Sequence, residues 1–158
     1  MPPQACSICE EVAGRITAPG GVIYDDGFWT VAHHTGPYTD PGELIVKLRR
    51  HCESLSELTA PEAAALGPVL RSAVGAVEQV VRPERVYTAS YGERVRHVHF
   101  FLLPRTSALP AGHIVSDVYR RARTVLRSWG VLPNPSEDAR AETAGRIRES
   151  DLWKRSSI

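Results

Sequence analysis

The stretch from His97 to Arg105 constrains the fold more than any other part of the chain. Its sequence, HVHFFLLPR, predicts a β-strand. Side chains alternate between the two faces of a strand, so His97, His99 and Phe101 share one face, and the two histidines are roughly 6.5–7 Å apart along it. Two imidazole rings among apolar neighbours are costly to bury unless each has a partner. A metal, a phosphate or a catalytic network would provide partners, and backbone hydrogen bonds in an ordinary core are the alternative.

Short apolar and β-branched segments predict four further strands. They are residues 22–24, 28–34, 44–48 and 85–91, with turn residues between them. Thr59 and Glu62 have the spacing of a capping box, and apolar residues at helical spacing predict a long helix that ends before Pro83. The order of elements predicts an α+β fold, in which an antiparallel five-stranded sheet carries the long helix on one face.

The character of the chain changes after residue 111. Residues 114–129 repeat apolar side chains such as Val115 at helical spacing, and Asn134 and Ser136 precede a more polar helical segment. This part is short and has little apolar surface, which argues against an independent core. We therefore expect one domain over residues 1–111 and a helical C-terminal extension over residues 112–158, packed on the same domain or on a second subunit.

The composition argues against several classes of partner. A formal net charge of +1 over 158 residues gives no general argument for binding nucleic acid or an anionic membrane. No apolar run approaches the ~20 residues of a membrane span, and residues 1–6 lack the pattern of a secretion signal. We expect a cytoplasmic protein, whose cysteines are metal ligands or free thiols rather than disulfides.

Cys6 and Cys9 form a C-x-x-C pair, a spacing at which both thiolates can bind one zinc ion. Such pairs also occur as redox partners or as buried thiols. Candidates to complete a tetrahedral set are His51 and His97, with Cys52 as a competitor. Once His97 binds a metal it cannot act as an acid or a base, which leaves the second histidine of its strand free.

Together these motifs resemble the histidine triad (HIT) superfamily of nucleotide hydrolases and transferases. The resemblance covers residues 5–105. It rests on the C-x-x-C pair, on the segment 41–46 (PGELIV) followed by Arg50 and His51, and on the closing HVH and LPR motifs. The superfamily has an antiparallel sheet with helices and commonly forms dimers, so the resemblance also implies a homodimer.

The resemblance implies a mechanism and a set of metal ligands. In this superfamily the middle histidine, which His99 matches, attacks the α-phosphate of a nucleotide, and water or another acceptor resolves the nucleotidyl-histidine. In the zinc-containing bacterial branch the metal is held by two N-terminal cysteines, by the histidine that ends the third strand and by the first triad histidine. These positions correspond to Cys6, Cys9, His51 and His97, which implies one structural zinc ion per chain.

The chain departs from the superfamily pattern at several positions. Phe101 stands where a third histidine donates to phosphate, and Glu43 replaces the histidine of a Pro-Gly-His motif. The usual Gly-Gln-Ser or Gly-Gln-Thr connection before the triad has shrunk to residues 93–96, and Ser90 stands in place of a frequent asparagine. The loss of one well-placed donor to a developing charge costs about 10²–10³ in rate.

Other side chains could replace the lost donors. Adjacent strand residues face opposite ways, so only one of His33 and His34 can point into the site. The loop alignment suggests His34, with a solvent-exposed ring as an equally strong alternative. Arg94 and Arg96 share a face and could clamp a phosphate, with a solvated turn as the alternative. The residues that we expect to contact substrate are His34, Ser90, Arg94, Arg96 and Phe101.

Three functions stay open at this point. The first is a nucleotide hydrolase or nucleotidyl transferase with an intermediate on His99. The second is a related enzyme for a non-nucleotide substrate, with Phe101 as an apolar wall of its site. The third is a catalytically silent binding protein stabilised by zinc. The presence of His99 favours the first two and Phe101 favours the last two, and we expect the first.

Overall fold

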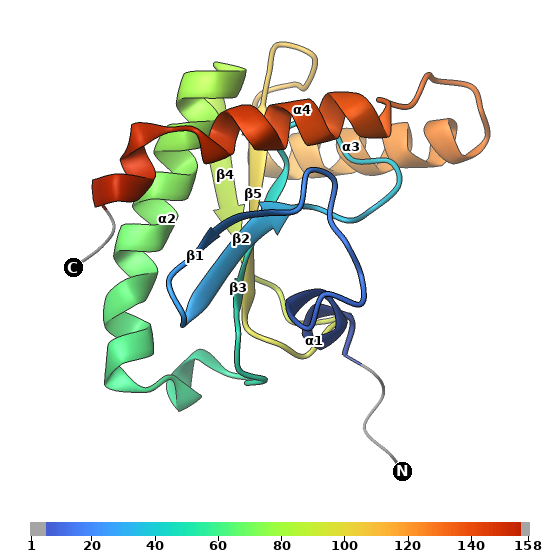
Figure 1. Cartoon of the computed structure of the whole chain (residues 1–158). Coiled ribbons are helices and arrows are strands. Elements are labelled where there is room, and N and C mark those ends of the chain that lie inside the picture. Colours follow the sequence, from blue (N-terminus) through green and yellow to red (C-terminus); the bar gives the residue numbers. More distant parts are fainter. Residues whose placement is uncertain (1–5, 156–158) are drawn as a thin grey trace.

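A five-stranded antiparallel sheet lies at the centre of the computed structural model, which describes residues 6–155 without the side chains of residues 113–117 and 155. Its strands follow the order β1-β2-β3-β5-β4 (Figure 1). They are β1 (Val22–Asp25), β2 (Trp29–His33), β3 (Leu44–Leu48), β4 (Arg85–Ala89) and β5 (His99–Arg105). The predicted α+β class is confirmed. Residues 1–5, which enter the argument about a secretion signal, lie outside the described residues, as does the side chain of Val115.

The register of the strands gives the sheet two different faces. Val46 pairs with Phe100 and Leu44 with Leu102, and these apolar side chains belong to the main core or pack against it. The alternate positions Lys47 and His99 also pair with each other, and they point to the opposite face. The sheet therefore separates the apolar core from the histidine-bearing face.

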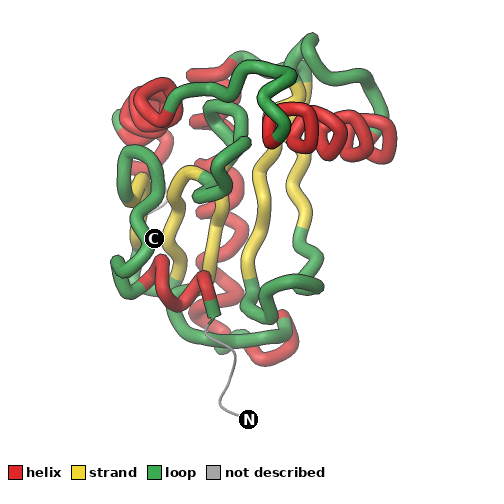
Figure 2. The backbone as a smooth tube through the Cα atoms, turned by 90° about the vertical axis from the view of Figure 1, so that its right-hand side faces the viewer, coloured by secondary structure: helices red, strands yellow, loops and turns green. Residues whose placement is uncertain are grey.

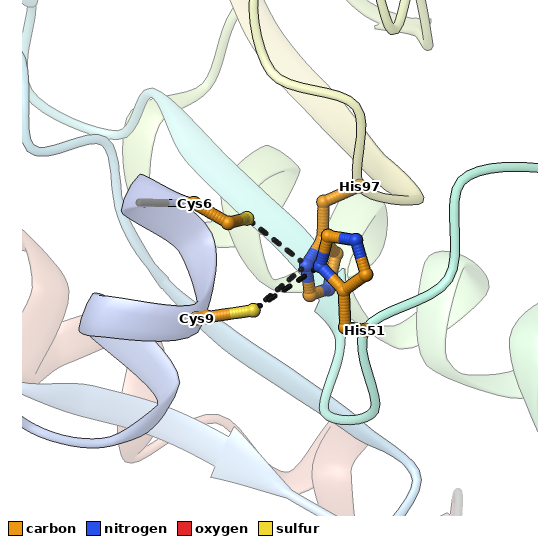
Figure 3. A group of neighbouring side chains, drawn as sticks. All are labelled: Cys6, Cys9, His51 and His97. Atoms are coloured by element: carbon orange, nitrogen blue, oxygen red, sulfur yellow. Dashed lines mark hydrogen bonds between the residues drawn. The ribbon is translucent and has the colours of Figure 1, made fainter. Parts of the chain in front are cut away.

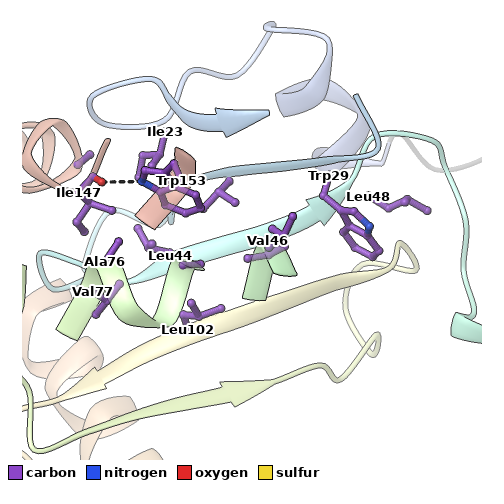
Figure 4. Packing of buried hydrophobic residues seen from close by; sticks show 14 of the residues in the cluster. Ile23, Trp29, Leu44, Val46, Leu48, Ala76, Val77, Leu102, Ile147 and Trp153 are labelled. Atoms are coloured by element: carbon purple, nitrogen blue, oxygen red, sulfur yellow. Dashed lines mark hydrogen bonds between the residues drawn. The ribbon is translucent and has the colours of Figure 1, made fainter. Parts of the chain in front are cut away.

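The helix α2 (Ala60–Val81) covers the core face of the sheet. The capping box is present, because the Thr59 side chain accepts from the Glu62 N–H while the Glu62 carboxylate accepts from the Thr59 N–H. Ala76 and Val77 of α2 lie beside the strands in the buried cluster of Figure 4. Trp29 adds a polar anchor, since its Nε1 donates to the Glu62 carbonyl at 2.8 Å.

The last segments of the chain complete the same core. Ala144 and Ile147 of α4 (Glu137–Arg148) and Trp153 of the 3-10 helix η2 (Asp151–Arg155) are buried within it (Figure 4). The Trp153 ring stacks on Tyr24 of β1 at a centroid distance of 4.8 Å, and its Nε1 donates to the Ile147 carbonyl at 2.8 Å. The C-terminal helix thus packs against the strands and α2.

The helix α3 (His113–Ser128) docks through its charged face. Arg127 donates to the Tyr38 carbonyl at 2.8 Å and to Asp40 at 2.6 Å, and Arg123 lies 3.4 Å from the same carboxylate. In contrast, the apolar side chains of Val118, Val125 and Trp129 are 62%, 44% and 73% exposed. The helix is present as expected, and guanidinium contacts at its C-terminal end attach it to the loop around Asp40, while these three apolar side chains face solvent.

A short helix and a longer one lie at the two ends of the histidine-bearing face. The helix α1 (Ser7–Val12), which the sequence analysis did not predict, and α3 lie near opposite ends of this face, while α2 lies behind the sheet (Figure 2). A 3-10 turn, η1 (Leu55–Glu57), leads into α2. No helix in the described ranges is long and apolar enough to cross a membrane.

The strand expected from residue 97 begins two residues later. His97 lies in a bend, because its N–H donates to the Val95 carbonyl, while the Val98 N–H donates to the Cys52 carbonyl. Regular pairing with β3 starts only at His99. The expectation that both histidines belong to one strand is therefore wrong.

Candidate functional site

Four side chains from three separate segments of the chain converge, as Figure 3 shows. Cys6 and Cys9 come from α1 and the residue before it, His51 follows β3, and His97 precedes β5. The Cys6 Sγ lies 3.4 Å from the His97 Nδ1, and the Cys9 Sγ lies 3.3 Å from the His51 Nδ1 and 3.6 Å from the His97 Nδ1. All four ligand atoms lie within 4.8 Å of one another.

These distances fit a tetrahedral metal site. Zinc binds cysteine sulfur at about 2.3 Å and histidine nitrogen at about 2.0–2.1 Å, which places neighbouring sulfur and nitrogen ligands about 3.5 Å apart. The observed separations of 3.3, 3.4 and 3.6 Å match that edge length. Two cysteines and two histidines are a common ligand set for structural zinc. The donor set therefore fits zinc and leaves no coordination position for a substrate.

The protein orients one of these ligands by a further hydrogen bond. The His97 Nε2 donates to the Leu48 carbonyl at 2.7 Å, so Nδ1 carries the lone pair that faces the cysteines. Burial and the neighbouring Cys6 raise the pKa of the Cys9 thiol to about 11. A cation at this point would be needed to keep Cys9 as a thiolate near neutral pH.

His99 is held in a single tautomer at the start of β5. Its Nδ1 donates to the His97 carbonyl at 2.5 Å, because a carbonyl can only accept. The neutral ring therefore has its lone pair on Nε2. His99 is not among the four converging side chains, so its Nε2 is not committed to that group.

Phe101 lies between two imidazole rings on this face. Its ring centroid is 5.1 Å from that of His99, in edge-on geometry, and 5.3 Å from that of His34, which stacks on it. The His34 Nδ1 accepts from the Gly36 N–H at 2.7 Å, which leaves Nε2 as its donor nitrogen. Burial lowers the pKa of His34 to about 4, so this ring is neutral at physiological pH.

His33 forms backbone hydrogen bonds that stabilise the fold, and it does not contact the group around His99. It is fully buried, its Nδ1 donates to the His34 carbonyl at 2.9 Å, and its Nε2 accepts from the Gly42 N–H at 3.2 Å. Gly42 has a φ of +88°, and a Cβ there would come within 2.5 Å of Val81.

The neighbouring Glu43 is buried, and burial raises the pKa of its carboxyl group to about 7.

Three of the expected substrate contacts are exposed side chains. Ser90 and Arg94 are exposed, and the 79% exposed side chain of Arg96 lies 3.9 Å from Glu53. None of the three forms a hydrogen bond or ion pair with His99 in the part of the chain that the structure describes. Their roles stay predictions.

Cys52, the competitor among the metal ligands, lies outside the group of four. It is buried, and its thiol donates to the Ser54 carbonyl at 3.1 Å. Its backbone carbonyl accepts from the Val98 N–H. Cys52 is therefore not one of the four candidate ligands. Its backbone hydrogen bond instead links the residue after His51 to the residue after His97.

The sequence analysis missed a buried ion pair on the histidine-bearing face. Lys47 of β3 contacts Glu11 of α1, and their side chains are 3% and 6% exposed. The signal in the sequence was a lysine inside the otherwise apolar strand LIVKL.

Solved structures match this chain along nearly its whole length. A hypothetical histidine triad nucleotide-binding protein from Sulfolobus tokodaii strain7 matches with a TM-score of 0.66 and 13% identity, over 95% of this chain and 93% of its own. A zinc-bound histidine triad family protein from Mycobacterium smegmatis matches with a TM-score of 0.62 and 18% identity, over 96% and 94%. This chain has the histidine triad fold.

A third structure with the histidine triad fold agrees with these two. It is a HIT-like protein involved in cell-cycle regulation from Bartonella henselae, which matches with a TM-score of 0.64 and 15% identity over 91% of this chain and 95% of its own. No protein-family model and no curated protein matches the sequence. Identities this low establish a shared fold, so the chemistry of the site is argued from its own geometry.

Proposed function

We propose that the protein is a nucleotide hydrolase or nucleotidyl transferase of the histidine triad type, acting on a nucleotide or a related phosphate ester. The observation that carries this proposal is the state of His99. Its Nδ1 donates to the His97 carbonyl, so Nε2 holds the lone pair that a nucleophile needs.

The reaction proceeds in two displacements at phosphorus. The His99 Nε2 forms a bond to phosphorus while the bond to the leaving group breaks, and the leaving group departs with the electron pair and takes up a proton from solvent. Water or another acceptor then attacks the same phosphorus, breaks its bond to Nε2 and releases a proton. The imidazole is regenerated with its original tautomer.

The four convergent side chains would hold one structural zinc ion per chain, with Cys6, Cys9, His51 and His97 as ligands. The ion would supply a cross-link between α1, the segment after β3 and the segment before β5. The peptide of His97 is the acceptor for His99, so the cross-link would fix the orientation of the nucleophile.

The substrate contacts follow from the same face. The His34 Nε2 is a donor nitrogen next to the Phe101 ring, and Phe101 forms an apolar wall beside His99. Ser90, Arg94 and Arg96 lie in and beside the connection that leads into β5, from which a bound phosphate could recruit them. We place this protein in the cytoplasm as a homodimer, with the free edge of β4 and the exposed stripe of α3 as surfaces for the second copy.

Trapping of the intermediate tests this proposal. Wild-type protein mixed with an adenosine phosphoramidate or a dinucleoside polyphosphate should show an acid-labile nucleotidyl adduct on His99 by mass spectrometry. The His99→Ala variant should lose both the adduct and turnover. Wild-type turnover in that variant would overturn the assignment.

Phe101 supports a second candidate, an enzyme for a non-nucleotide substrate. Its ring offers no hydrogen bond to phosphate oxygens at the point where the superfamily has a donor. Turnover that requires His99 but is found only with substrates lacking a nucleotide would favour this candidate.

A further inference from the structure

A lysine side chain is buried directly across the strands from His99. Lys47 of β3 and His99 of β5 are register partners. Side chains of such partners lie on the same face, with Cβ atoms about 4.5–5.5 Å apart. The Lys47 side chain is 3% exposed, so its charge lies in the protein interior beside the nucleophile.

The hydrogen bonds of this lysine are incomplete. Its Nζ donates to Glu11 of α1, whose other carboxylate oxygen accepts from the Thr35 hydroxyl at 3.0 Å. An ammonium group has three N–H donors, and Glu11 is its one acceptor among the described residues. Among the described residues this leaves two N–H donors of a buried cation open to a further partner, on the face that carries His99.

Stability alone does not account for this pair. Replacing a buried ion pair with apolar side chains of similar size is often neutral or stabilising. The rest of β3 is apolar and fully buried, so an apolar residue would suit position 47 equally well. A charged acceptor bound at His99 would satisfy the remaining donors.

Resting on the function proposed above, we propose that Lys47 is a catalytic residue that binds the phosphoryl oxygens of the substrate at His99. It supplies the donor that Phe101 lacks, and it does so from β3 instead of β5. Glu11 is its counter-ion in the free protein. The group bound at His99 is accordingly an anionic phosphoryl group.

A double replacement tests this role without leaving a buried charge unpaired. The variant Lys47→Met with Glu11→Gln should fold and retain its metal, as thermal unfolding and metal analysis would show. Its kcat/KM should fall by about 10²–10³, the usual cost of one lost donor to a developing charge. Its affinity for AMP and for inorganic phosphate, measured by calorimetry, should fall at least ~10-fold, because a charged hydrogen bond is lost.

Two further variants separate anion binding from a purely structural tie between α1 and the sheet. Glu11→Gln alone breaks the tie but keeps the lysine, so it should bind phosphate as tightly as the wild type or more tightly. If Glu11→Gln lost phosphate binding as fully as the double variant, the pair would be a structural tie and the proposal would be wrong. The matched control is Lys154→Met, which removes the other lysine of the chain, 81% exposed and paired with Asp151.

The outcomes also separate this inference from the proposed function. If the wild type binds AMP and forms the His99 adduct while the double variant binds AMP equally well, only the role of Lys47 is overturned. If the wild type binds neither phosphate nor AMP and forms no adduct, the proposed function fails and the role of Lys47 fails with it.

Discussion

At the scale of single residues, Phe101 makes the surface between the His34 and His99 rings apolar. Its ring lies about 5 Å from two imidazoles, both with a hydrogen bond at Nδ1. These two rings are therefore oriented by backbone groups, and Phe101 fills the space between them without adding a donor. Donors to a bound anion must therefore come from His34, from the connection before β5 or from neighbouring strands.

The first prediction is that Phe101→His raises turnover on an adenosine phosphoramidate or a dinucleoside polyphosphate. The new ring adds a donor where charge develops, which is worth about 10²-fold in rate when well placed. Steady-state kinetics measure the change in kcat/KM, with His99→Ala as the inactive reference. A decrease would show that the apolar ring belongs to the site, and would favour the non-nucleotide substrate.

The second prediction concerns His34 and acid stability. Its pKa is lowered to about 4 in the folded chain, against about 6.5 when unfolded, so the unfolded state binds more protons between these values. The contribution of His34 to the free energy of unfolding should therefore fall by about 2 kcal/mol from pH 7.5 to pH 5, while the raised pKa of Glu43 contributes in the opposite direction in both the wild type and the variant. Urea titrations at both values should show a smaller fall in His34→Gln, and an equal fall would contradict the assignment.

At the scale of elements, the short helix α1 shows what a sequence pattern cannot provide. Six residues make fewer than two helical turns, too few for a repeating apolar pattern to show, and isolated helices of this length are unstable in water. Tertiary contacts stabilise it, through buried Ile8 and through Glu11 on Lys47. The long strands and α2 were predictable, because alternation and a capping box are local signals.

The parts of the candidate site differ in the same way. The four sulfur and nitrogen ligands were predictable from residue type and from the resemblance, and the structure brings them together. The position of the Arg96 side chain was not predictable, because the direction of a side chain in a turn depends on neighbours such as Glu53. Lys47 was missed because its partner Glu11 is distant in sequence and belongs to the unpredicted helix.

The third prediction is that wild-type protein purified without chelator contains near-stoichiometric zinc, and that Cys9→Ser and His97→Ala each lose it. A structural zinc ion contributes folding free energy, so both variants should unfold roughly 10 °C or more below the wild type. Cys52→Ala is the matched control and should keep its zinc. Undiminished zinc in His97→Ala, or loss of zinc in Cys52→Ala, would show that the ligand set is wrong.

At the scale of the whole molecule, the two ends of the described chain are built into the fold by different means. The N-terminal end is held at the group of sulfur and nitrogen ligands, and the C-terminal end is held by aromatic packing. Trp153 closes the core from the side of β1 and α2, with its indole N–H paired to Ile147.

The fourth prediction compares two tryptophans. Trp153→Ala should reduce the free energy of unfolding by about 3–5 kcal/mol, because it leaves a cavity in the main core. Trp129→Ala removes the same side chain at a 73% exposed position and should change it by less than about 0.5 kcal/mol. Chemical denaturation of both variants measures the difference, and equal effects would contradict the packing described for η2.

The attachment of α3 to the rest of the molecule should depend on the concentration of salt. Arg123 and Arg127 hold this helix on Asp40, so mobile ions compete with the attachment. The core under α2 is held by apolar burial, which sulfate and similar salts strengthen. As the concentration of such a salt rises, the two parts of one chain should respond in opposite directions: the core tightens while α3 loosens.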